Sequence, residues 1–218
     1  MAFRSKSRQS RPLRYFWYVS DAKLDMLLGS FGESTWRRIT AELDLDVKLV
    51  GVKLTRPAAD RSLAERSWAE KAAVVEECIR RQQGIGDLSA TRGYFAAEIE
   101  LAWEPCDDNE TVLFCGHAGP LLLVLGGSVS HLLSHPSKTG HTGSHPYAIR
   151  AAMRGSSSPG DIAGDVQAAA LAVSDTPPQP VRFLAVVLQR GVLPPRSERT
   201  EYLLATPLYV EAARMTNI

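Results

Sequence analysis

Three short apolar segments separated by polar turns open the second half of the chain, and they constrain the fold more than any other feature. They span residues 93–104, 111–117 and 119–127. The connections "PCDDNE" and "HAG" are short, as in antiparallel hairpins. The third segment contains "PLLLVLGG", an apolar run with the length of a buried strand. The pattern predicts a β-meander.

Helical patterns fall mainly in the first third of the chain. Apolar residues spaced three and four apart predict helices over 21–31, 33–44 and about 61–83, with a further helix over 160–175. Alternating or aromatic segments predict further strands over 13–19, 45–55, 181–191 and 201–213. We therefore expect an α+β fold with an antiparallel or mixed sheet and a β-meander in the second half.

The length and charge of the chain limit its class. Its 218 residues fit a disordered basic tail over 1–12 and a single α+β domain over 13–218, with a long polar loop at about 131–160. The net charge of +1 argues against a dedicated nucleic-acid binder, although the basic residues of the N-terminal tail suit contacts with phosphate. No secretory signal or membrane span is recognisable, and three cysteines at no disulfide-like spacing indicate reduced thiols. These features predict a cytoplasmic protein.

Four of the five histidines lie in "HLLSHPSKTGHTGSH", residues 131–145. In a helix, His131 and His135 would share one face, and neutral imidazole is a good ligand for a divalent metal such as zinc. His141 and His145 repeat the four-residue spacing. However, no Glu follows His131, and no carboxylate lies between residues 111 and 160. A metal site at these four histidines is therefore the alternative to solvated loop histidines.

Two junctions between a strand and a helix are candidate ligand sites. Ser20, Asp21 and Lys23 surround the first, where an anion would meet the positive end of the helix dipole. Gly127 and Ser128 end the apolar run 121–125, where backbone N–H groups can bind an anion. Helix capping and a glycine turn explain both junctions without a ligand, and this interpretation is the favoured one.

The first junction also carries a family resemblance. "YFWYVSDAKLDML" resembles the N-terminal YxYVSDxKxDML-like signature of an uncharacterised bacterial, actinomycete-rich domain family of unknown function. The closing "LLATPLYVEAA" resembles the C-terminal strand of the same family. The resemblance implies a cytosolic protein and brings no catalytic or ligand residues.

Two functions remain open from the sequence. The favoured one is a cytosolic, non-enzymatic, regulatory domain that binds a protein partner or a small molecule through its long loops. The alternative is a metal-dependent hydrolase in which His131 and His135 hold a metal that lowers the pKa of its bound water.

Overall fold

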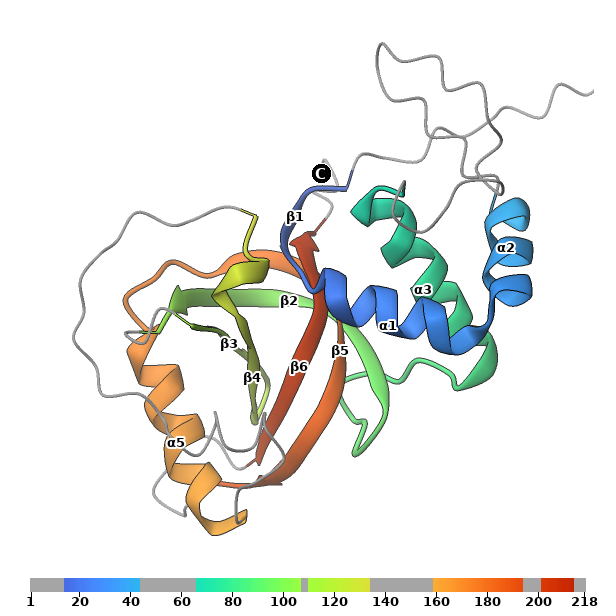
Figure 1. The fold of residues 1–218 in the computed structure, drawn as a ribbon. Helices are drawn as coiled ribbons and strands as arrows, with labels where there is room; N and C mark the ends of the chain where they lie inside the picture. Colours follow the sequence, from blue (N-terminus) through green and yellow to red (C-terminus); the bar gives the residue numbers. More distant parts are fainter. Residues whose placement is uncertain (1–13, 44–65, 107–109, 134–158, 194–200, 214–218) are drawn as a thin grey trace, which may run out of the picture.

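The computed structural model describes residues 14–43, 66–106, 110–133, 159–193 and 201–213. The elements drawn in Figure 1 are β1 (Phe16–Val19), α1 (Asp21–Phe31), α2 (Glu33–Glu42), α3 (Trp68–Gln82), β2 (Tyr94–Pro105), β3 (Thr111–Ala118), β4 (Leu121–Ser128), the 3-10 turn η3 (Val129–His131), α5 (Pro159–Ala172), β5 (Gln179–Val192) and β6 (Glu201–Ala212). The strand predicted over 45–55 lies outside the described residues. None of the described helices is long and apolar enough to cross a bilayer.

Five of the strands form a closed barrel. The sheet order is β1-β6-β4-β3-β2-β5, and β5 pairs again with β6, so that β2 to β6 make a ring. The antiparallel β2-β3-β4 meander is confirmed, while β4 and β6 run parallel and make the sheet mixed. The α+β class is correct, but closure was not predicted, because it depends on pairing between strands far apart in the sequence.

The order of the elements is that of an OB-type barrel: a meander, a helix, and a hairpin whose last strand pairs with the third strand of the meander. OB barrels bind ligands across the face of their second and third strands. Here α5 covers the outer face of β3 and β4, where its Val166 and Ala169 belong to one apolar cluster with Leu113 and Val124. The barrel alone therefore assigns no function to this chain.

Side-chain alternation along the strands divides the core into an interior and two outer clusters. The barrel interior receives apolar side chains from all five strands, among them Phe95, Phe114, Leu123, Phe183 and Leu203. Both faces of β4 are buried along residues 121–127, and its first five residues are all apolar. Leu121, Leu123 and Leu125 point into the barrel, and Leu122 and Val124 pack beneath α5.

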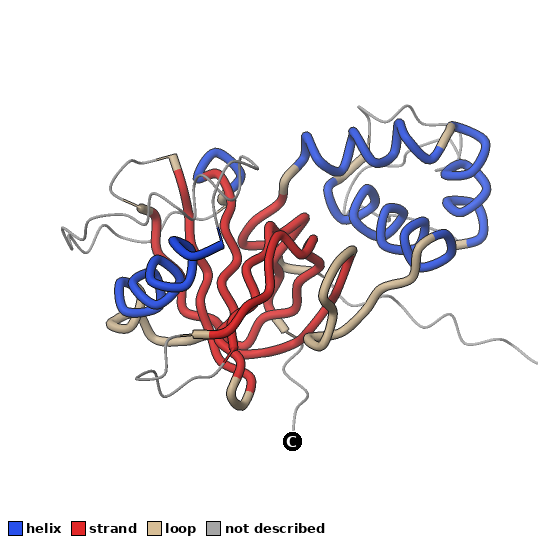
Figure 2. The backbone as a smooth tube through the Cα atoms, turned by 90° about the horizontal axis from the view of Figure 1, so that it is seen from below, coloured by secondary structure: helices blue, strands red, loops and turns tan. Residues whose placement is uncertain are grey.

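The helices α1, α2 and α3 form a lobe against the outer side of the barrel (Figures 1 and 2). Its apolar cluster joins the buried side chains of these helices to Leu184, Leu208 and Tyr209 of β5 and β6. The helix expected from about residue 61 begins later, at Trp68. Ser67 is the N-cap residue of α3, because its hydroxyl accepts from the Glu70 N–H while the Glu70 carboxylate accepts from the Ser67 N–H.

Candidate functional site

Tyr18 joins the two junctions that the sequence presents separately. Its side chain is fully buried, and its ring lies over Gly127, where a Cβ would come within 2.6 Å of the ring. Its ring also meets the imidazole of His131 edge to face, with 5.8 Å between centroids. The backbones of these two segments are also paired, because Tyr18 forms an isolated antiparallel bridge with Leu132. β1 therefore packs against the end of β4. We call the group Tyr18, Ser20, Asp21, Lys23, Gly127, Ser128 and His131 the Tyr18 cluster.

The hydroxyl of Tyr18 is buried and has no acceptor of good geometry among the described residues. Within the usual limits of distance and angle, it makes no hydrogen bond to any residue that the structure describes. Burial raises the pKa of Tyr18 to about 12, while the backbone of Ser128 and the side chain of Ser20 act in the opposite direction. A fully buried hydroxyl without a hydrogen bond of good geometry is unusual in a folded protein.

Lys23 extends from α1 to β6. Its ammonium donates to the Thr206 hydroxyl and, at 3.2 Å, to the Pro207 carbonyl. These two residues lie between the part of β6 that pairs with β4 and the part that pairs with β1, so that side of β6 has no strand neighbour there. Burial lowers the pKa of Lys23 to about 8. Lys23 thus closes a gap in the sheet and holds a partly buried positive charge.

Asp21 belongs to an ion-pair group between α1 and α3. The buried Lys71 ammonium lies 2.8 Å from the Asp21 carboxylate and 2.9 Å from that of Asp25. The charges of Lys23 and Asp21 also act on the pKa of His131. Burial lowers the pKa of its imidazole most, Lys23 adds to the decrease, and Asp21 opposes it. His131 therefore lies beside the β1–α1 junction.

The remaining candidate residues have local structural roles as well. Ser20 is the N-cap residue of α1, but its hydroxyl does not cap the helix, and its backbone N–H donates to the Leu208 carbonyl. Ser128 caps η3 by accepting from the Ser130 N–H. Tyr18 and Thr206 were not among the sequence candidates. The sequence held two signs of Tyr18: it is part of the quoted signature before Ser20 and Asp21, and a glycine inside a strand indicates close approach of another group without naming it.

The structure changes the geometry on which the metal hypothesis depends. η3 ends at His131, and Leu132 is extended, so no helix carries the chain from His131 towards His135. His135, His141 and His145 lie outside the described residues. Within the described ranges, no group of three or more His, Cys, Asp or Glu side chains is placed to hold a metal ion. A metal site that includes the remaining histidines stays a prediction.

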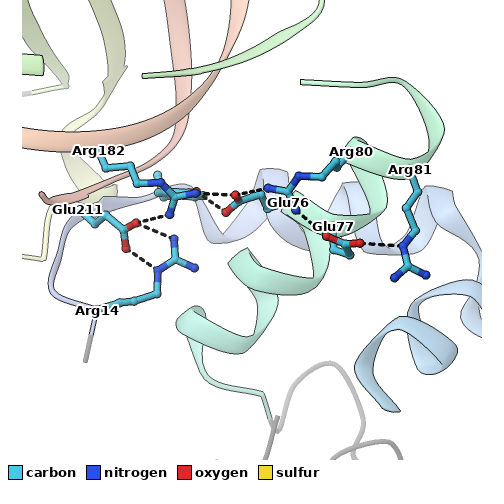
Figure 3. Close-up of polar contacts among 8 residues, drawn as sticks. Arg14, Glu76, Glu77, Arg80, Arg81, Arg182 and Glu211 are labelled. Atoms are coloured by element: carbon cyan, nitrogen blue, oxygen red, sulfur yellow. Dashed lines mark hydrogen bonds and ion pairs between the residues drawn. The ribbon is translucent and has the colours of Figure 1, made fainter. Parts of the chain in front are cut away.

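A second polar cluster fastens the helical lobe to the barrel (Figure 3). The Glu76 carboxylate on α3 accepts from Tyr209 at 2.7 Å and from Arg182 at 2.5 Å, and Arg182 also donates to Glu211 at 2.8 Å. Arg14 donates to Glu211 at 3.0 Å and so continues the chain of contacts to the segment before β1. We call Arg14, Glu76, Arg182, Tyr209 and Glu211 the lobe–barrel network. Both of its carboxylates are satisfied, which indicates a structural role.

Comparisons with known proteins give one assignment for the whole domain. Part of the chain is similar to an isoleucine–tRNA ligase of Pyrobaculum aerophilum, with 30% identity over 89 residues. That match covers 41% of this chain and 9% of the ligase. No solved structure matches the chain. The model of a family of unknown function, DUF7019, matches residues 14–214, which include both the β1–α1 signature and the closing strand. The chain belongs to this family.

Proposed function

We propose that this protein is a cytosolic, non-enzymatic binding domain with a regulatory role, and that the Tyr18 cluster binds a small molecule. The observation that carries the proposal is the contact of Tyr18 with both candidate junctions. Its ring lies over Gly127 and beside His131, while its hydroxyl lies near Ser20 and Ser128. Polar groups from segments about 110 residues apart thus converge at one place beside the barrel.

The state of the charged groups favours binding over catalysis. A general base needs to be free to take a proton from a bound substrate. The two carboxylates of α1, Asp21 and Asp25, are instead engaged by Lys71. The Lys23 ammonium is held by Thr206 and Pro207. Groups fixed in this way suit the orientation of a ligand, and the partly exposed Lys23, Ser128 and His131 give a ligand access to the cluster.

The proposal is tested by screening a small-molecule fragment library against ¹⁵N-labelled protein by NMR. We expect at least one compound to shift the amides of Gly127, Ser128 and residues 20–23 together, with saturation. His131→Ala should weaken that binding, whereas His117→Ala, at an exposed position of β3, should leave it unchanged. A library without any such compound, or equal binding by the His131 and His117 variants, contradicts the proposal.

A further inference from the structure

We infer that the ligand of the Tyr18 cluster carries an oxyanion, a phosphate or carboxylate group, which the Tyr18 hydroxyl, Lys23 and the first turn of α1 bind together. The inference rests on the proposed function and adds the chemical class of the ligand. It depends on an excess of hydrogen-bond donors in the cluster, which an acceptor-rich group would satisfy.

The first turn of α1 supplies part of this excess. The first intrahelical bond runs from the Leu24 N–H to the Ser20 carbonyl, so the N–H groups of residues 21–23 have no acceptor within the helix. In many helices the N-cap side chain accepts one of them. Ser20 does not, since its hydroxyl makes no capping bond. An 11-residue helix therefore presents uncapped donors and the positive end of its dipole.

Tyr18 supplies the second, independent observation. Its hydroxyl is buried beside the N-cap residue Ser20 and has no partner of good geometry among the described residues. A buried hydroxyl without a hydrogen bond is unfavourable, and its presence calls for an acceptor. An oxyanion bound at the start of α1 would accept the Tyr18 proton and the helix N–H groups at the same time.

The charges around the cluster are compatible with an anion. Lys71 lies within 2.9 Å of the carboxylates of Asp21 and Asp25 and offsets one of their two negative charges, and Lys23 offsets the other. Lys23 adds a positive charge on the same helix, and two of its donors are used by Thr206 and Pro207. An ammonium has three donors, so within the described part of the chain one remains for a ligand.

Titration with inorganic phosphate and with acetate at pH 7 and constant ionic strength, followed by ¹⁵N NMR, tests the inference. We expect at least one of the two anions to cause saturable shifts at residues 20–23 and at Gly127 and Ser128. Tyr18→Phe and Lys23→Met should each weaken this binding at least fivefold. Arg38→Met is the control, because this α2 side chain is 69% exposed and its loss changes the net charge equally.

Thermal unfolding of Tyr18→Phe separates a ligand role from a structural one. A hydroxyl without a partner can be removed without loss, so the midpoint of this variant should be unchanged or higher. A lower midpoint would show that the hydroxyl is bonded within the protein, and the inference would fall. It would also fall if neither anion bound, or if Arg38→Met weakened binding as much as Lys23→Met. If only neutral or cationic fragments shift the same amides, the proposed binding function stands and the oxyanion is refuted.

Discussion

Glu76 is the central carboxylate of the lobe–barrel network, and its replacement tests whether this network holds the helical lobe on the barrel. In Glu76→Gln the side chain keeps its shape but loses its charge and one of its two acceptor oxygens. The wild-type carboxylate accepts from Tyr209 and Arg182, and also from Arg80 at 2.8 Å. At least one of these three donors will then face an amide NH₂ group.

The expected cost follows from burial. The Glu76 side chain is 9% exposed, and removing one partner of a buried ion pair costs about 3–5 kcal/mol. Arg182 is 35% exposed and can regain water, which places the expectation at the lower end, about 3 kcal/mol. For a domain of this size, each kcal/mol corresponds to about 2–4 °C in the melting temperature, so we expect a decrease of about 6–12 °C.

Urea denaturation at pH 7 measures the loss, and hydrogen exchange of the α3 amides shows whether the lobe loosens first. Glu77→Gln is the matched control on the same helix. Glu77 pairs with Arg80 and Arg81, which are 53% and 40% exposed, and such pairs contribute about 0–1 kcal/mol. If Glu76→Gln destabilises the protein no more than Glu77→Gln does, the network does not hold the lobe and the reasoning from burial is wrong.

Three further predictions address the network, the Tyr18 cluster and the start of α3. Burial acts to raise the pKa of Glu76, but the Tyr209 hydrogen bond and the nearby arginines outweigh it, so the pKa is lowered. The charged Glu76 therefore stabilises the folded protein above the unfolded pKa of about 4.3, and this contribution is lost as the pH falls through the folded pKa. The difference in unfolding free energy between wild type and Glu76→Gln should therefore narrow below about pH 4. Gly127→Ala should cost about 1–3 kcal/mol in urea denaturation because its methyl group would collide with Tyr18, whereas Gly164→Ala, in open space on α5, should gain about 0.5–1 kcal/mol. Ser67→Ala should cost about 1 kcal/mol and increase hydrogen exchange at the start of α3, and an unchanged rate would contradict the capping role.

Local patterns in the sequence predicted most of the described elements. α1 and α2 follow from apolar residues three and four apart, and Leu24, Leu28, Trp36 and Ile39 are indeed buried. The meander follows from its two short turns. The predicted start of α3 is wrong although the signal for the true start is also local: Ser67 and Glu70 form a capping box, whereas apolar residues at helical spacing continue upstream of it.

Features that depend on distant pairing could not be predicted in this way. Barrel closure requires β5 to pair with both β2 and β6, and a period-two pattern carries no information about the partner strand. Arg14 shows the same limit for charges. In the sequence Arg14 lies just after the basic tail and has no evident partner, whereas the structure places it against Glu211, 197 residues away, and over the rings of Phe16 and Tyr209.

The histidine-rich stretch shows how such distant pairing changes a functional hypothesis. By spacing alone, the neighbour of His131 is His135, and two imidazoles four residues apart suggest a metal. In the structure the chain leaves η3 as an extended segment, and Leu132 pairs with Tyr18. The neighbours of His131 become a phenol and, through its effect on the imidazole pKa, the ammonium of Lys23. Lys23 and Asp21 act on the pKa of this imidazole in opposite directions, so charges of both signs surround His131, and the described residues beside it do not supply the further ligands that a metal site needs.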